Sequence, residues 1–395
     1  MNHKLVMALS CFSLFIAGCG GDSGNDTTNE DEAITTLTGV FIDSKVANIS
    51  YQTETQSGTT NIHGEFTYLA GENLTFSIGE LELPTVKAMG VITPMTLAGH
   101  SSIYNQTATN IAMLLQSLDE NGILEGGITI PVDAASAASA SIDFTATTAD
   151  FINNAAVTNM VANAGINRAS LVSATSAQQH LQDSINELMP YVGAWSLVSE
   201  TQESHLVLFA DNTFIYAEND AELPNGLEYG HYSYDNRNGD LTFSISYDNN
   251  GPGEDSGVGD IGTDVTTDTA LSNNNNTLKI LNGAMTFSAQ NLDSSSIVGA
   301  WSPVDSNQKL QIILFDDNTF LIAESANKDP NGLQLGRYSY DASAAEITLS
   351  LTYDDTRDGS GIGSSDEDII MDAVLSDDKN TLSLMNGGVI LNRAL

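Results

Sequence analysis

The sequence predicts a mainly β protein with a small α-helical subdomain, in which a β-sandwich is followed by helices and then by two tandem antiparallel β-barrel domains. Three observations predict this fold class. Short runs of alternating apolar and polar residues, separated by Gly and Asn, fill residues 37–104 and most of the C-terminal half. Apolar residues at helical spacing lie between these regions. The C-terminal half also contains a long internal repeat.

The first 18 residues have the pattern of a bacterial lipoprotein signal peptide. Lys4 precedes an apolar run over residues 5–16, and Ala17 and Gly18 stand directly before Cys19. A run of this length is too short for the ~20 residues that cross a bilayer as a helix. The segment resembles the lipobox read by lipoprotein signal peptidase, which implies that residues 1–18 are removed and that Cys19 carries the lipid. An ordinary cleavable signal peptide is the alternative.

The same resemblance indicates where the protein is held. In lipoproteins of this kind an Asp directly after the cysteine usually signals inner-membrane retention, whereas this chain has Gly20. The resemblance therefore implies the outer membrane, with the membrane as a partner through the acyl chains on Cys19. Residues 19–36 are rich in Gly, Asp, Asn, Thr and Glu, which predicts a flexible tether.

Composition excludes one class of partner. The chain has 395 residues, with 12 Lys and Arg against 51 Asp and Glu, and a formal net charge of −39. Nucleic acid is excluded as a partner because phosphate binding needs a basic surface. The two cysteines are Cys11 in the signal peptide and Cys19, so the mature domains have no disulfide and no thiolate metal ligand.

Residues 37–104 are predicted to form the β-sandwich. Residues 39–43 read Gly-Val-Phe-Ile-Asp, and residues 60–68 follow the hairpin pattern T-x-x-x-G-x-F-x-Y. Together these motifs resemble the hallmark of carboxypeptidase-regulatory-like (transthyretin-like) domains. The resemblance implies a structural or binding module and brings no catalytic residues.

Residues 105–190 are predicted to form a helical subdomain that packs against the sandwich or joins it to the barrels. The Ala/Ser/Thr-rich stretch 134–149 is predicted to be exposed. Three sets of apolar residues recur at helical spacing. They are Ile111, Leu114, Leu115 and Leu118 for the first helix, Phe151, Ile152, Ala155, Ala156 and Met160 for the second, and Leu181, Ile185, Leu188 and Met189 for the third.

Residues 191–290 and 297–395 are predicted to be duplicated domains. The matched segments are 193–196 with 299–302, 208–209 with 314–315, 211–214 with 317–320, 224–227 with 330–333, and 232–235 with 338–341. The register stays constant to residues 247–248 and 353–354, then slips in an acidic, Gly-rich loop. Each copy contains about eight strand-like runs, which suits a small closed barrel without free edges.

Gly-x-Trp opens the first strand of each copy, with Trp195 and Trp301 in equivalent positions. This opening, the following Asn-Thr-Phe turn and a Gly-x-Tyr-x-Tyr strand resemble lipocalin-like (calycin) domains, in which the Trp plugs one end of the barrel. An Arg near the last strand often covers the Trp in that family. Arg393 is placed to do so in the second copy, and the first copy has no matching Arg.

Equivalent polar and aromatic residues provide the candidate ligand-binding set. A Glu near aromatic rings inside a barrel could bind a polar ligand head, and the alternative is a solvated strand residue that faces outward. The candidates are Trp195, Glu218 and Tyr232 in the first copy and Trp301, Glu324 and Tyr338 in the second. Glu218 and Glu324 lie in different domains, so they do not form an acid–base pair.

Acidic turns provide candidate sites for Ca²⁺, a hard ion that prefers oxygen ligands. The candidate ligands are Asp119 and Asn121 after the first helix, Asp248 and Asn250 in the first copy, and Asp354 and Asp358 in the second. None of these turns matches the full EF-hand pattern, and Arg357 adds an unfavourable positive charge. Solvated acidic turns are the alternative.

No catalytic constellation is evident. No two histidines have the spacing of a zinc hydrolase motif, and no nucleophile elbow or phosphate loop occurs. Three function classes remain. They are a non-catalytic, outer-membrane-anchored binding or adhesion module for a polysaccharide, protein or small molecule, a carrier of a small or lipophilic ligand, and a cell-envelope enzyme or enzyme accessory. We favour the first because duplication without catalytic motifs suits avidity.

Overall fold

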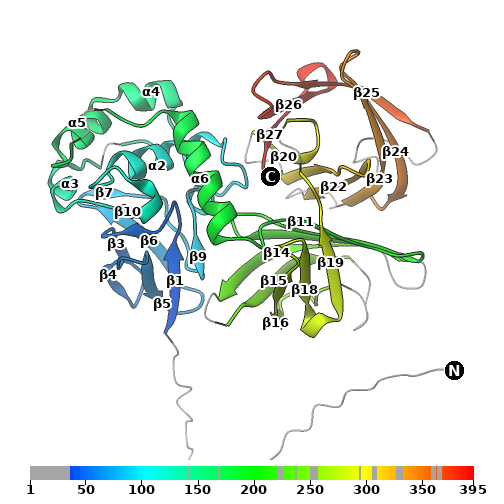
Figure 1. Cartoon of the computed structure of the whole chain (residues 1–395), viewed down its shortest axis with the longest axis horizontal. Coiled ribbons are helices and arrows are strands. Elements are labelled where there is room, and N and C mark those ends of the chain that lie inside the picture. Colours follow the sequence, from blue (N-terminus) through cyan, green and yellow to red (C-terminus); the bar gives the residue numbers. More distant parts are fainter. Residues whose placement is uncertain are drawn as a thin grey trace, which may run out of the picture. The chain divides into compact units, whose positions relative to one another are not determined.

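The computed structural model describes residues 36–395 apart from residues 141, 168–169, 221–225, 236–237, 250–256, 293–294, 305–308, 326–331, 357–361 and 363–366. The predicted fold class is confirmed. The described residues form a sandwich-like N-terminal region, a small set of helices and two barrel-shaped sheets (Figure 1). The predicted signal peptide, Cys19 and nearly all of the predicted tether lie outside the described residues.

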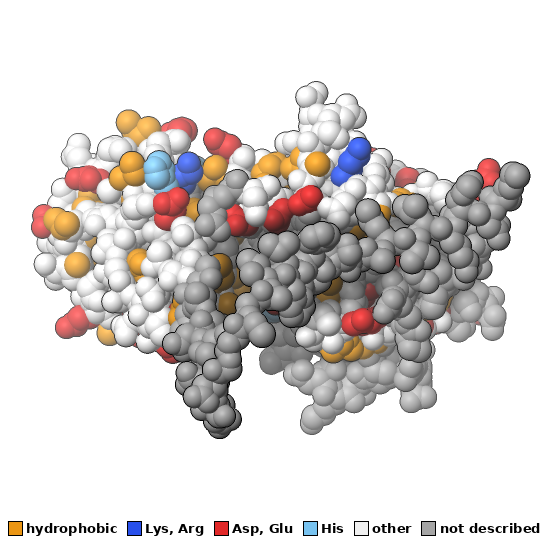
Figure 2. All heavy atoms as spheres, turned by 90° about the horizontal axis from the view of Figure 1, so that it is seen from below, with side chains coloured by type: hydrophobic (Ala, Val, Ile, Leu, Met, Phe, Trp, Pro, Cys, Tyr) orange, Lys and Arg blue, Asp and Glu red, His pale blue; other side chains and the backbone are white. Residues whose placement is uncertain are grey.

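The surface reflects the acidic composition. On the face drawn in Figure 2, Asp and Glu side chains lie scattered among neutral ones, with few Lys or Arg between them. The negative charge on this face is therefore spread over solvated side chains.

The N-terminal region consists of short strands in small sheets. These are β1 (Leu37–Phe41), β2 (Val46–Ala47), β3 (Ser50–Gln52), β4 (Ser57–Thr59), β5 (Glu65–Tyr68), β6 (Asn73–Ile78), β7 (Leu81–Glu82), β8 (Val86–Lys87), β9 (Val91–Ile92) and β10 (Ile128–Thr129). The sheets run β5-β1-β9, β10-β2 and β4-β3-β6-β7, and β8 also pairs with β6. Alternate residues of β6, namely Leu74, Phe76 and Ile78, are buried, as the period of two requires.

The helical subdomain contains six described helices. They are α1 (Pro94–Ala98), α2 (Gln106–Ser117), α3 (Val132–Ala137), α4 (Thr148–Asn153), α5 (Ala155–Asn163) and α6 (Ala174–Leu188), with a single 3₁₀ turn η1 (Leu124–Gly126). The predicted second helix is divided into α4 and α5. Asn154 causes the break, because its side chain accepts a hydrogen bond from the Ala156 N–H (2.8 Å) and so caps a new helix.

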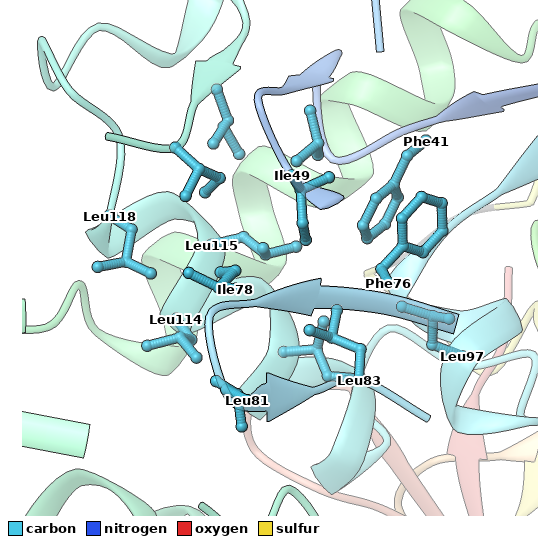
Figure 3. Close-up of a cluster of buried hydrophobic side chains, with 14 of the residues drawn as sticks. Phe41, Ile49, Phe76, Ile78, Leu81, Leu83, Leu97, Leu114, Leu115 and Leu118 are labelled. Atoms are coloured by element: carbon cyan, nitrogen blue, oxygen red, sulfur yellow. The ribbon is translucent and has the colours of Figure 1, made fainter. Parts of the chain in front are cut away.

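One apolar core joins the sandwich to the helices. The Phe41 and Phe76 rings stack with centroids 4.5 Å apart, and Figure 3 shows Leu114 and Leu115 of α2 in the same cluster. The stretch 134–149 is less exposed than we predicted. Ala134, Ile142 and Phe144 are buried in this core, since α3 packs onto it.

Each repeat forms a barrel-shaped antiparallel meander. The first contains β11 (Gly193–Val198), β12 (Gln202–Leu208), β13 (Thr213–Asp220), β14 (Gly226–Asp235), β15 (Asp240–Asp248), β16 (Asp264–Asp268), β17 (Ala270–Ser272), β18 (Thr277–Ile280), η2 (Leu281–Gly283) and β19 (Met285–Ala289). The second contains β20 (Gly299–Pro303), β21 (Lys309–Leu314), β22 (Thr319–Ser325), β23 (Gly332–Asp341), β24 (Glu346–Asp354), β25 (Ile369–Leu375), β26 (Thr381–Leu384), η3 (Met385–Gly387) and β27 (Val389–Arg393).

The second barrel is closed, with β27 paired to β20 (orange to red in Figure 1). The first follows the same path, but Thr269 interrupts the strand that corresponds to β25, so β16 and β17 are separate. Both barrels have a register shift at an equivalent glycine, Gly230 or Gly336. A Cβ at either position would lie 2.1 or 2.2 Å from a carbonyl oxygen of the neighbouring strand, so only glycine fits.

The two barrels contact each other through equivalent faces. The buried cluster between them contains matching residues of the two copies, which are Val207 and Ile313, Phe209 and Phe315, Ile215 and Leu321, Ala217 and Ala323, and Leu227 and Leu333. Strand alternation directs these side chains outward, while their neighbours fill each barrel. Use of the same patch on both copies is the arrangement of an isologous interface.

Candidate functional site

The two tryptophans predicted to bind ligand lie in the barrel cores. The exposed fraction of Trp195 is 2% and that of Trp301 is 0%. Each indole Nε1 donates to a carbonyl oxygen four residues earlier, that of Tyr191 (2.9 Å) or that of Ile297 (3.0 Å). The single N–H of each indole is therefore already bound within the protein.

Arg393 covers the second tryptophan. Its guanidinium carbon lies 4.2 Å from the centroid of the Trp301 ring, as the sequence predicted. Arg393 also donates to the carbonyl oxygens of Ser296 (2.6 Å), Val298 (2.7 Å) and Lys379 (2.9 Å). The pairing partner of Trp195 is Ala289, so the first barrel lacks this cover.

The hydroxyls of the candidate tyrosines donate to backbone carbonyl oxygens within the same barrel. The Tyr232 hydroxyl donates to the Phe209 carbonyl oxygen (2.6 Å), and the Tyr338 hydroxyl donates to that of Phe315 (2.8 Å). Burial raises the pKa of Tyr232, and it raises the pKa of Tyr338 to about 12. Both hydroxyls are therefore neutral and close the same turn in each barrel.

The candidate glutamates differ between the copies. Glu218 is 2% exposed and accepts hydrogen bonds from Gln202 Nε2 (3.0 Å) and the Gly257 N–H (3.2 Å). Glu324 is half-buried and lines a cavity of about 210 Å³ that also includes residues 99–101 and Asp211. Burial raises the pKa of Asp211, which lies in the wall of this cavity.

Sequence reasoning missed a buried glutamate in the first barrel. Glu228 has no exposed surface, and both its carboxylate oxygens accept from the Val258 N–H (2.9 Å). Burial raises the pKa of Glu228 to about 8. Its counterpart Gln334 accepts from the Ile362 N–H (3.0 Å) in the same way. The repeat itself was the available signal, because both copies place a polar residue at the same strand position, between two residues that are apolar or aromatic.

The predicted calcium ligands are described in part. Both Asp119 carboxylate oxygens accept backbone N–H groups, those of Thr129 (2.9 Å) and Ile123 (3.0 Å), and Asn121 Oδ1 accepts the latter as well (2.6 Å). Asp354 accepts from the N–H and hydroxyl of Thr356 (2.9 and 2.6 Å). Asp248 pairs with Glu228 across β15 and β14, whereas Asn250 and Asp358 lie outside the described residues. Within the described ranges, no group of three or more His, Cys, Asp or Glu side chains is placed to hold a metal ion.

Two serine–histidine pairs join parts of the fold. Ser44 Oγ lies 2.9 Å from His180 Nε2, and this contact holds the β1–β2 turn to α6. Ser44 Oγ also donates to the Leu124 carbonyl oxygen of η1 (2.9 Å). Ser196 Oγ lies 2.7 Å from His205 Nδ1. The imidazole of His205 is 1% exposed and stacks on a ring of the second barrel. Both pairs therefore have a structural role, because their histidines hold separate parts of the fold together.

An open cleft of about 910 Å³ lies outside the barrels. Its walls come from α6, from the ends of β11 and β19, and from β27 with the C-terminal residues. Side-chain amides dominate the polar part of these walls. They belong to Gln178, Gln179, Gln182, Asn186, Asn275, Gln290, Asn380 and Asn392.

Helix α6 supplies half of these amides because it is amphipathic. Leu181 and Ile185 are buried in the core shared with the first barrel, and Gln178, Gln182 and Asn186 form the stripe beside this buried face, which lines the cleft. Gln178 Nε2 donates to the hydroxyl of a residue on α2 (2.9 Å), and Gln182 Nε2 donates to Asn186 Oδ1 (3.1 Å). Helix packing and these bonds therefore fix the amides along the wall.

No helix of the described residues is long and apolar enough to cross a membrane. Comparison of the chain with protein-family models, with curated proteins and with solved structures gave no match.

Proposed function

We propose that this chain is a non-catalytic binding lipoprotein, anchored in the outer membrane by acyl chains on Cys19. One observation carries the proposal. Both barrel interiors are filled by side chains, and the equivalent Trp and Tyr candidates in them bond to backbone carbonyl oxygens, whereas an open, polar cleft remains outside the barrels. Ligands bind proteins in clefts where placed polar groups converge and fix the orientation of the ligand.

The family resemblances enter the same proposal. The eight-stranded meander, the buried Trp301 and the guanidinium of Arg393 over it support a lipocalin-like (calycin) assignment of the repeats. The β1–β5 pairing, which joins residues 37–40 to 65–68, supports a carboxypeptidase-regulatory-like sandwich. Neither assignment supplies a catalytic residue.

A carrier function is the second candidate. The cavity of about 210 Å³ between the barrels supports it, since Phe209, Tyr229 and Ala323 contribute apolar wall. Its volume is below the 300–1,000 Å³ typical of small-molecule sites, so we rank it after surface binding.

Two measurements test the proposal. The full-length chain, produced in a bacterium that processes lipoproteins, is expected in the outer-membrane fraction, and Cys19→Ala is expected to release a folded protein. A Cys19→Ala protein that stays in the membrane fraction would overturn the anchoring. Native mass spectrometry of the released protein is expected to give the bare polypeptide mass, and a co-purifying lipophilic adduct would favour the carrier function instead.

A further inference from the structure

We infer that the amide-lined cleft binds a neutral, hydroxyl-rich ligand, a saccharide without acidic groups. The inference rests on the proposed binding function and adds the place and the chemical class of the ligand. Four properties of the cleft carry it, which are its charge, its hydrogen-bonding groups, its aromatic wall and its size.

The cleft is nearly uncharged in a strongly acidic protein. The chain has a net charge of −39, yet among the residues that the structure describes only two charged side chains line the cleft, those of Asp378 and Arg393. Arg393 is 3% exposed, and its guanidinium is committed to three carbonyl oxygens and the Trp301 ring. An anionic ligand would therefore meet Asp378 without a free cation to offset it.

The amides match the chemistry of hydroxyl groups. Each Asn or Gln side chain offers two donors and one acceptor with two lone pairs, and a hydroxyl both donates and accepts. Gln178 and Gln182 stand one helical turn apart, so the amide wall repeats at about 5.4 Å. A chain of sugars presents hydroxyls repeatedly along its length and can use several of these amides at once.

Tyr104 adds the apolar surface that such a ligand needs. It lines the cleft, is half-buried against the core of the first barrel, and so offers a ring held in place. The C–H faces of sugar rings pack on aromatic rings of this kind. A cleft of about 910 Å³ is also at the upper end of the range for ligand pockets, which suits an oligosaccharide better than a single sugar.

A peptide is the less favoured occupant. Protein interfaces draw their binding energy mainly from exposed Trp, Tyr and Arg anchors. In this cleft Trp195 is 2% exposed and Arg393 is held by its own backbone contacts, so Tyr104 is the one accessible anchor of that kind among the lining residues.

Calorimetric titration of the released Cys19→Ala protein with neutral and acidic oligosaccharides tests the inference. The double variant Gln182→Ala/Asn392→Ala removes amides from two walls of the cleft and is expected to weaken binding of the neutral ligand about tenfold or more. Asn159→Ala, which removes an exposed amide of α5 outside the cleft, is the matched control and is expected to bind unchanged. Thermal unfolding of each variant shows that the fold is retained.

Each outcome decides the inference separately from the proposed function. Neutral-saccharide binding that the double variant loses and Asn159→Ala keeps supports it. Binding that ignores the cleft variants overturns the site, and binding of only acidic saccharides or peptides overturns the ligand class, while both leave the proposed binding function standing. If no saccharide binds, the inference is wrong, and fractionation and native mass spectrometry still decide the anchoring and the carrier alternative.

Discussion

The Asn249 side-chain amide donates a hydrogen bond to the carboxylate of Asp355, and the two residues occupy the same position in the two repeats. The Oδ1 atoms of both residues accept equivalent backbone N–H groups, since Asn249 Oδ1 accepts from Leu227 (2.6 Å) and Asp355 Oδ1 accepts from Leu333 (2.5 Å). A bond between equivalent residues is what a two-fold axis between the barrels would produce. The asymmetry of Asn against Asp makes the pair complementary, because two carboxylates there would repel each other.

This pair predicts a cost for its removal. Asp355→Ala deletes the bond between the barrels and leaves the Leu333 N–H without its side-chain acceptor, so we expect a loss of about 1–3 kcal/mol in the free energy of unfolding. Urea denaturation measures it. Asp377→Ala removes an equal charge from an exposed turn and is expected to change stability by less than about 0.5 kcal/mol. Equal effects of the two variants would contradict a specific role for Asp355.

Glu228 predicts a pH dependence that belongs to the first barrel. Its folded-state pKa is raised to about 8 from 4.5, so the folded protein holds a proton that the unfolded chain releases between those values. The contribution of Glu228 to stability is therefore complete below pH 4.5 and falls as the pH rises to about 8, by up to about 1.4 kcal/mol for each pH unit. Glu228→Gln is expected to flatten this part of the stability–pH curve, as measured by thermal unfolding from pH 5 to 9.

The second barrel offers the matched control for this prediction. Gln334 already holds the equivalent loop through the Ile362 N–H, so Gln334→Glu is expected to steepen the loss of stability with rising pH. Asp43, whose burial raises its pKa to about 8, contributes to the same window in every variant and cancels in the differences. A Glu228→Gln curve parallel to the wild-type curve would show that Glu228 is ionised in the folded protein.

The sequence predicts the architecture because the fold depends on patterns within short segments. Alternation marks the strands, the repeat marks two equal domains, and helical spacing places α2 and α6. The break at Asn154 and the burial of Ala134 were not predicted, because the first depends on one capping bond and the second on which surface α3 meets.

The candidate site was less predictable for a related reason. Trp195 and Tyr232 stand out in the sequence because they are large and repeated, and those properties mark packing as readily as binding. The cleft instead combines α6 and the adjacent start of β11 with β19 and β27, which lie about a hundred and two hundred residues further along the chain, so no local pattern contains it. Its one sequence signal is the amide face of α6, where Gln178, Gln182 and Asn186 follow helical spacing.

Arg393 predicts that the barrels differ in what holds their tryptophans. Arg393→Ala removes three bonds to backbone carbonyl oxygens and the contact with Trp301, so we expect a loss of at least about 2 kcal/mol from the second barrel. Trp195 and Trp301 are the only two tryptophans, so fluorescence in a Trp195→Phe background reports on the second barrel alone. Arg337→Ala, which deletes an exposed arginine of β23, is the control and should leave that unfolding midpoint in place.

Substitution of Asp119 distinguishes two roles for its carboxylate, a structural acceptor of backbone N–H groups and a ligand of calcium. Its two oxygens hold the N–H groups of Ile123 and Thr129 at a residue that is 2% exposed, so Asp119→Ala is expected to cost about 1–3 kcal/mol in unfolding free energy. Because these bonds need no ion, we expect the same loss in calcium and in excess chelator, measured by thermal unfolding. Asp133→Ala removes the carboxylate of an exposed residue at the start of α3 and serves as the control. A loss of stability confined to the calcium-containing sample would instead make Asp119 a ligand of the ion, because a bound ion stabilises the folded state only through the residues that hold it.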